Sequence, residues 1–155
     1  MDLPEQIARL LRAAVFGGNW TAVNLKTQLQ DVTWEEATTQ VYGLNTIATL
    51  VYHLHYYVRA LAPVLQGEPL NASDKLSFDH PPIASQADWE GFLEKVYGES
   101  EAFCGLLESM PEEKLWENVA DPKYGHFYRN IHGIIEHHHY HLGQIVLLKK
   151  IIRHS

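Results

Sequence analysis

Histidines crowd the C-terminal part of the chain and give it its clearest chemical signal. Five of the ten histidines fall between residues 132 and 141. His137 and His141 are four residues apart, a spacing that places both side chains on one face of a helix. Such a pair can offer two imidazole nitrogens to one metal ion. A third ligand must come from elsewhere, and His53 lies in another strongly apolar segment with helical spacing.

Helical phase separates the histidines that point inward from those that do not. At about 100° per residue, His137 and His141 share the apolar side of one predicted helix, and His53 lies on the apolar side of another. If the two helices are neighbours, the three imidazoles meet at one level of the core and form a divalent-metal site. The other histidines of the last helix are expected at the solvated surface: His132, His138 and His139.

Other polar residues near these histidines are candidates for a supporting role. Tyr57 and Gln144 share the histidine faces by helical phase, so either could orient a ligand or a substrate. His55 lies on the opposite side of its helix and is expected at an edge, not far from Arg59. No carboxylate shares the inward face of either helix. The sequence therefore identifies no general base and no catalytic residue.

Long helices must position these side chains. Apolar spacing predicts four of them, over residues 3–16, 45–66, 86–109 and 130–152. Two shorter helical pieces are predicted between the first two, with these candidate N-cap residues: Asn19 or Thr21 for one, and Thr33 for the other. No strand alternation of useful length occurs. The predicted fold class is all-α, and the predicted architecture is a four-helix bundle.

The connection between the second and third long helices indicates how the bundle is wound. Residues 67–85 are rich in proline and polar side chains and read as a loop. A helix of about 20 residues is about 30 Å long, and about nine or ten extended residues cross that length. A connection of this size can run back along the bundle and leave the two helices parallel. The sequence therefore predicts up-down-down-up topology with a long crossover between helices 2 and 3.

Composition excludes several classes of protein. At 155 residues with 46% hydrophobic content, the chain fits one globular domain over residues 1–155. Nineteen acidic and twelve basic side chains give a net charge of −7, without the clustered cations that nucleic acids require. No apolar run reaches the length of a membrane-spanning helix. The single cysteine, Cys104, fits a reducing compartment and is expected to be buried, so we expect a cytoplasmic protein.

The two-part histidine pattern resembles that of the DinB/YfiT-like superfamily. The matching segments are residues 50–54, Leu-Val-Tyr-His-Leu, and residues 137–144, His-His-His-Tyr-His-Leu-Gly-Gln. By helix count and loop placement, the resemblance covers nearly the whole chain. Within the superfamily, the chain is similar to a subgroup of uncharacterised small proteins that carry stretches like residues 17–21 and 128–137.

The resemblance carries its own expectations about fold, metal and partners. It implies an up-down-down-up four-helix bundle that often forms homodimers. It also implies a divalent metal ion, commonly nickel or zinc, bound by His53, His137 and His141. Characterised relatives include thiol-dependent transferases and isomerases that use low-molecular-weight thiols such as mycothiol or bacillithiol, whereas many other members have no established activity. The implied partners are therefore a small-molecule substrate, with a low-molecular-weight thiol among the candidates, and a second copy of the chain.

Two hypotheses about function follow. In the first, the chain is a metal-dependent enzyme that performs S-transfer with a thiol, or hydrolysis, on a small molecule. In the second, it is a non-catalytic dimeric bundle that binds a ligand or partner and whose metal is structural or absent. A fourth protein ligand would close a structural site, whereas a catalytic site keeps a position open. His80 and His126 lie in predicted loops from which either could close the site.

Overall fold

The computed structural model describes residues 1–154, and this part of the chain is helical and has no β-strand. The four long helices are α1 (Leu3–Phe16), α4 (Ile47–Leu65), α5 (Gln86–Glu108) and α6 (Phe127–His154). The two short helices are α2 (Leu25–Leu29) and α3 (Trp34–Thr38). Three 3₁₀ turns complete the elements: η1 (Asp74–Phe78), η2 (Glu112–Trp116) and η3 (Pro122–Tyr124). The prediction of an all-α chain with four long helices is confirmed.

Capping side chains explain where most helices begin. Thr46 and Ser85 accept hydrogen bonds from the first turns of α4 and α5, and Thr33 forms a capping box with Glu36 at α3. The cap of α3 agrees with the sequence prediction. The predicted cap of α2 was wrong, because Asn24 caps this helix. The Asn19 side chain instead donates to the backbone carbonyls of Ala13 and Val23 and so holds the loop between α1 and α2.

The last helix begins three residues earlier than predicted. Its first residue, Phe127, is 4% exposed, and its backbone N–H donates to the carbonyl of Glu117. A single β-bridge between Asn118 and His126 holds the chain just before this point. The preceding loop thus anchors the start of α6, which extends the helix beyond the apolar pattern that predicted it.

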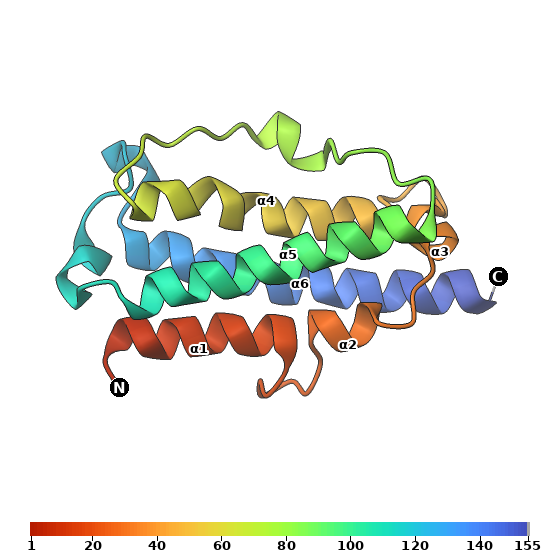
Figure 1. Ribbon diagram of the computed structural model, residues 1–155, viewed down its shortest axis with the longest axis horizontal. Helices are drawn as coiled ribbons and strands as arrows, with labels where there is room; N and C mark the ends of the chain where they lie inside the picture. The colour runs from red at the N-terminus through yellow and green to blue at the C-terminus, as the bar shows by residue number, and fades with distance from the viewer. Residues whose placement is uncertain (155) are drawn as a thin grey trace.

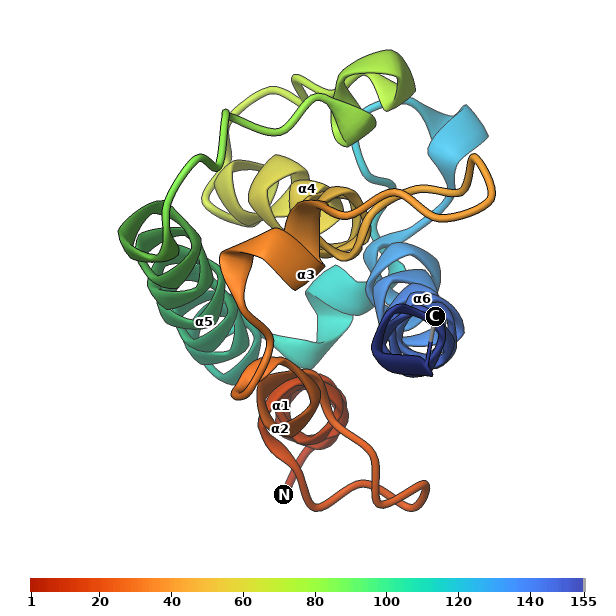
Figure 2. The ribbon, with the colours of Figure 1, turned by 90° about the vertical axis from the view of Figure 1, so that its right-hand side faces the viewer.

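The four long helices pack lengthwise around a common core. α1 contacts α5 and α6, and α4 contacts the same two helices, so each long helix has two long neighbours. Figure 2 looks along the helices and shows this arrangement, with α1 opposite α4 and α5 opposite α6. Buried apolar side chains fill the centre in two clusters, one toward each end of the molecule. Cys104 is buried among them, and burial raises the pKa of its thiol to about 12, so the thiol stays protonated and unreactive.

The segment between α4 and α5 runs back along the molecule. In Figure 1 it leaves the left end of α4, passes above that helix and enters α5 at the right. α4 and α5 therefore run in one direction in this view, and α1 and α6 run in the other. Residues 66–85, here called the crossover, include the η1 turn that packs on α4. The crossover thus covers the middle of the helix that carries His53.

No helix among residues 1–154 combines the length and the apolar character that crossing a membrane requires.

Candidate metal centre

The three histidines singled out by helical phase lie together in the core. α4 supplies His53, and α6 supplies His137 and His141 from successive turns of one face. His53 Nε2 is 3.0 Å from His137 Nε2, and one ligand nitrogen from each of the three rings lies within 4.8 Å of the others. His53 and His141 are buried, and His137 is partly buried. The three side chains are close enough to bind one metal ion.

A hydrogen-bond chain from the crossover fixes the proton on His53. His53 Nδ1 lies 2.8 Å from the hydroxyl of Ser77, and that hydroxyl donates its own proton to the carbonyl of Asp74 at 2.7 Å. Because the Ser77 proton is already donated, Ser77 Oγ must accept from His53 Nδ1–H. The network therefore assigns the lone pair of His53 to Nε2, the atom that faces His137.

His141 is oriented in the same way by its own helix. Its Nδ1 lies 2.6 Å from Gln144 Oε1, and an amide oxygen can only accept, so Nδ1 carries the proton and Nε2 the lone pair. Gln144, chosen by phase as a supporting residue, thus orients a histidine three residues away. Each of these two rings presents an unprotonated nitrogen and is held from behind by a hydrogen-bond acceptor, as is typical of metal-binding histidines.

The electrostatics of the cluster favour neutral imidazoles. Burial, and then the neighbouring His141, lowers the pKa of His53. Burial and the adjacent His141 and His53 lower the pKa of His137 to about 4. At neutral pH both rings are therefore uncharged, which is the form that binds a metal ion. With the His53 lone pair on Nε2, the 3.0 Å contact to His137 Nε2 needs either a proton or a cation between the two nitrogens.

Aromatic rings enclose two sides of the cluster. The Phe78 ring stacks on the His53 imidazole with a centroid separation of 3.9 Å and an angle of 12°. The Tyr57 ring lies edge-on to His53 and His137 at 5.4 and 5.1 Å, and its hydroxyl donates to Asp74 Oδ1. Burial raises the pKa of the Tyr57 hydroxyl, so it remains a hydrogen-bond donor at neutral pH. These contacts hold the imidazole planes in place.

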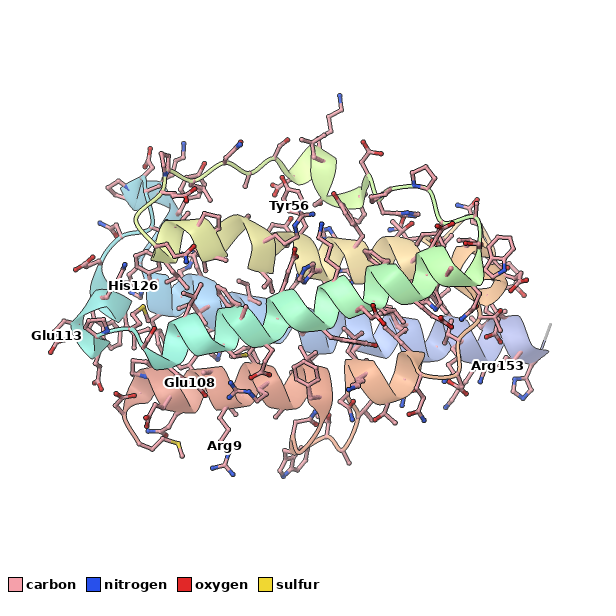
Figure 3. All side chains as sticks on the ribbon, viewed as in Figure 1. Arg9, Tyr56, Glu108, Glu113, His126 and Arg153 are labelled. Atoms are coloured by element: carbon pink, nitrogen blue, oxygen red, sulfur yellow. The ribbon has the colours of Figure 1, made fainter. Side chains whose placement is uncertain are left out.

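Sequence reasoning missed the contribution of the crossover. Ser77, Phe78 and Asp74 all come from η1, a segment predicted only as a polar connection. Asp74 also brings a carboxylate to the edge of the site, which neither helix face could supply. Tyr56 reaches the same segment, because its hydroxyl accepts from the backbone N–H of Ser73, and Figure 3 shows its side chain directed toward the crossover. The one sequence signal for such packing was the pair of apolar residues, Leu76 and Phe78, within an otherwise polar stretch.

Two further histidines are buried, contrary to prediction. His138 is 3% exposed, its Nδ1 bonds to the carbonyl of Ile134, and burial lowers its pKa to about 4. His55 is also 3% exposed, and its Nε2 lies 2.5 Å from Glu99 of α5. The prediction from helical phase failed because each of these helices has two long neighbours: α6 packs against α1 and α4, and α4 packs against α5 and α6. Two neighbours bury a wider part of the helix surface than a single apolar stripe indicates. His132 is exposed as predicted, whereas His139 is partly buried.

Neither loop histidine completes the cluster. His80 bonds through Nδ1 to the carbonyl of Pro81 and packs near Tyr52. His126 packs against the rings of Trp116 and Tyr128 at the left end of the molecule in Figure 3. Within residues 1–154, the group of potential metal ligands consists of His53, His137 and His141. The described part of the chain therefore leaves at least one position for a small ligand.

A cavity of about 620 Å³ opens beside the histidines, between α4 and α6 and under the crossover. Its lining includes Tyr57, Asp74 and His137 at the histidine end. This volume lies within the range of pockets that bind small molecules.

Comparison with known proteins adds no assignment. A scan against protein-family models, a search of the curated proteins and a search of the solved structures each find no match to this chain.

Proposed function

We propose that this chain is a metal-dependent enzyme of the DinB/YfiT-like type, with a divalent ion held by His53, His137 and His141 in an up-down-down-up four-helix bundle. The directions of the four long helices in Figure 1 support the topology. The pairing of His53 with a histidine pair four residues apart supports the family. Three imidazole ligands suit zinc and nickel, and these are the proposed metals.

One observation carries the proposal. Ser77 and Gln144 each accept the Nδ1 proton of a histidine and thereby leave Nε2 of His53 and of His141 unprotonated, and His53 Nε2 lies 3.0 Å from His137 Nε2. Bonds of this kind behind the rings, with the free nitrogens turned toward a third imidazole, are what metal-binding histidines require. Three imidazole nitrogens within 4.8 Å of one another fit a divalent ion.

The chemistry depends on what enters the open position. A divalent ion held by imidazoles lowers the pKa of a bound thiol or water and so supplies thiolate or hydroxide near neutral pH. We propose thiol-dependent S-transfer, with hydrolysis as the alternative, because the superfamily resemblance includes thiol-dependent enzymes. Tyr57, held by Asp74, lines the cavity edge-on to the His137 ring, so it contacts whatever enters the cavity at the histidine end.

A non-catalytic role with a structural metal is the competing proposal. It would be favoured by a fourth ligand that closes the site, but His80 bonds to the carbonyl of Pro81 and His126 packs against the Trp116 ring. The cavity beside His137 also gives small molecules a route to the histidines. Both features favour the enzyme. Association into homodimers remains part of the proposal through the superfamily resemblance.

Metal analysis of protein purified without a nickel affinity step tests the proposal directly. We expect about one zinc or nickel ion per chain, and loss of the ion in the His53→Ala/His137→Ala variant with the helical content retained. A His132→Ala/His154→Ala variant removes two exposed histidines and should keep the ion. A wild-type protein that neither holds nor takes up zinc or nickel would contradict the metal site and, with it, the enzyme.

A further inference from the structure

The cavity beside the histidines has a second polar end. On α6, Arg129, Gly133 and His137 follow one another at intervals of four residues, so they lie in a row on one face of the helix. All three line the cavity. Eight residues at 1.5 Å each separate Arg129 from His137 by about 12 Å along the helix axis. The cavity therefore extends from the candidate metal centre toward a guanidinium group.

Small residues leave room between the two ends. Gly133 has no side chain, and a Cβ built there would meet no atom within 4 Å. Ala60 of α4 also lines the cavity. Since Gly is unfavourable within a helix relative to Ala by about 1 kcal/mol, helix stability alone does not account for Gly133. Its effect on shape is to keep the path between Arg129 and His137 open.

The charge of Arg129 is not neutralised within the described residues. Its Nη1 donates to the backbone carbonyl of Tyr124 at 3.0 Å, and no carboxylate of residues 1–154 forms an ion pair with it. The backbone at Gly125 adopts a φ of 75°, and a Cβ there would lie 3.2 Å from Arg129 Cδ. A glycine is therefore needed for the loop to approach the arginine side chain so closely. The guanidinium is held at the cavity with donors to spare.

The acidic residues that line the cavity, Asp74 and Glu136, have other neighbours than Arg129. Asp74 accepts from the hydroxyl of Tyr57, and Glu136 lies 3.6 Å from His132 Nδ1. Among the described residues, Arg129 is the one arginine or lysine that lines the cavity, and no carboxylate pairs with it. A planar guanidinium pairs best with a carboxylate or a phosphate. The two nearby carboxylates disfavour a dianion, which selects a carboxylate over a phosphate monoester.

We infer that the substrate is an elongated small molecule whose reacting end lies at the histidines and whose other end is a carboxylate held by Arg129. The position of the reacting end rests on the proposed function, whereas the carboxylate contact does not. Binding of the carboxylate by Arg129 can therefore be tested in metal-free protein, where the result does not depend on the metal site.

Three six-carbon probes that differ at one end form the test: hexanoate, hexan-1-ol and hexyl phosphate. Each is titrated into metal-free, isotope-labelled protein, and the amide signals of Gly133 and Arg129 are followed by NMR. We expect hexanoate to bind about tenfold more tightly than hexan-1-ol, the difference expected for one charge-assisted hydrogen-bonded contact. We also expect it to bind more tightly than hexyl phosphate.

Variants assign the effect to the arginine. Arg129→Ala should remove the preference for hexanoate over hexan-1-ol, and Arg129→Lys should keep part of it. Gly133→Leu fills the path and should weaken all three probes, and an unchanged circular dichroism spectrum and Tm would exclude a folding defect as the cause. Arg9→Ala, which removes an exposed arginine that points away from α1 in Figure 3, should change nothing.

The failures of the two proposals are separable. No detectable hexanoate binding, equal affinities for hexanoate and hexan-1-ol, tighter binding of hexyl phosphate, or an unchanged preference in Arg129→Ala would each overturn the carboxylate site. Metal analysis answers the other question independently. A protein without metal uptake but with an Arg129-dependent preference would retain the carboxylate site and lose the proposed reaction.

Discussion

At the scale of single residues, the candidate centre depends on proton positions as much as on the histidines. Ser77 is fully buried, and it accepts from His53 while it donates to the Asp74 carbonyl. It thereby settles which nitrogen of His53 is free. Without this acceptor, the imidazole could rotate or change tautomer, and the free lone pair would no longer point to the other two rings.

Ser77→Ala is therefore expected to weaken zinc binding by about 10- to 100-fold, the usual cost of removing a partner of a ligating histidine. Zinc affinity measured by competition with a chromophoric chelator checks this. Ser100→Ala is the matched control, because Ser100 is equally buried but bonds only to the carbonyl of Val96 in its own helix. Equal zinc affinity in the two variants would show that Ser77 plays no part in the site.

At the scale of elements, the crossover and α4 act as one unit around His53. η1 packs on α4 through the His53–Ser77 bond, the stacked Phe78 ring and the Tyr56–Ser73 bond. A metal ion that immobilises His53 should therefore also immobilise η1. The crossover otherwise has few buried side chains and is expected to open more readily than the long helices.

Zinc should accordingly slow amide hydrogen exchange in η1 severalfold while exchange in α1 stays unchanged, since α1 supplies no residue to the histidine cluster or to the cavity beside it. Exchange measured by mass spectrometry with and without zinc checks this. In Ser77→Ala, the protection of η1 should be smaller at matched zinc occupancy. Uniform protection of every helix would instead indicate global stabilisation without specific coupling to the crossover.

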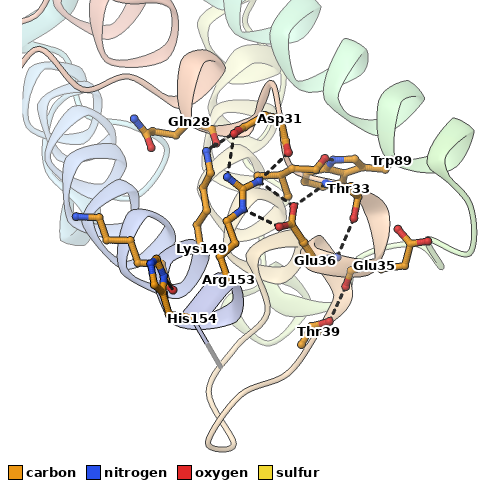
Figure 4. Close-up of polar contacts among 12 residues, drawn as sticks. Gln28, Asp31, Thr33, Glu35, Glu36, Thr39, Trp89, Lys149, Arg153 and His154 are labelled. Atoms are coloured by element: carbon orange, nitrogen blue, oxygen red, sulfur yellow. Dashed lines mark hydrogen bonds and ion pairs between the residues drawn. The ribbon is translucent and has the colours of Figure 1, made fainter.

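The end of α6 is held by a different device. Lys149 and Arg153 bond to Asp31, and Arg153 also bonds to Glu36, as Figure 4 shows. These ion pairs join the last turns of α6 to the segment that contains α2 and α3. Hydrogen bonds from Lys149 and then Arg153 lower the pKa of Asp31 from 3.8 to about 2.

The sign of the resulting pH dependence follows from this shift. A carboxyl with a lowered pKa stabilises the folded state above its unfolded pKa, and the contribution is lost as pH falls from about 4 through about 2. Because the Asp31 side chain is 53% exposed, solvent screening limits the contribution to about 1 kcal/mol. Asp31→Asn should lower the free energy of unfolding by that amount at pH 6 and by much less at pH 2.5, as measured by urea denaturation.

A control separates this effect from general acid destabilisation. Asp79→Asn removes an exposed carboxylate that forms no ion pair among the described residues, and it should leave the free energy of unfolding nearly unchanged at both pH values. A constant difference between wild type and Asp31→Asn across this range would contradict the ion-pair account.

At the scale of the whole molecule, metal binding and stability are coupled. His53 comes from α4 and the other two histidines from α6, so one ion would cross-link two long helices that are far apart in sequence. The unfolded chain does not hold these three residues together. A ligand that binds only the folded state stabilises it by about 2.7 kcal/mol at a free concentration 100 times its Kd.

Zinc at that concentration should therefore raise the Tm of the metal-free protein by about 5–10 °C, given the size of the domain. Differential scanning calorimetry checks this. The His53→Ala/His137→Ala variant should show no rise, and the His132→Ala/His154→Ala variant should behave as wild type. An equal rise in both variants would show that zinc stabilises the protein at some other position.

Local patterns in the sequence determined the long helices and the inward histidines. The apolar period and the capping residues depend on near neighbours in the chain, so the Thr33 cap and the faces of His53, His137 and His141 could be predicted without knowledge of the fold. The all-α class followed from the same patterns.

Only the tertiary structure decided what surrounds those histidines. The contact of Ser77 with His53 depends on where a polar crossover settles on α4, and no periodic pattern fixes that position. The burial of His138 depends on how many helices cover α6, and the cavity that joins His137 to Arg129 depends on the separation of two helices. Long-range packing sets the Ser77 contact, the burial of His138 and the shape of the cavity. Packing is the sum of many contacts between segments that are distant in sequence, so no single segment carries a pattern that predicts it.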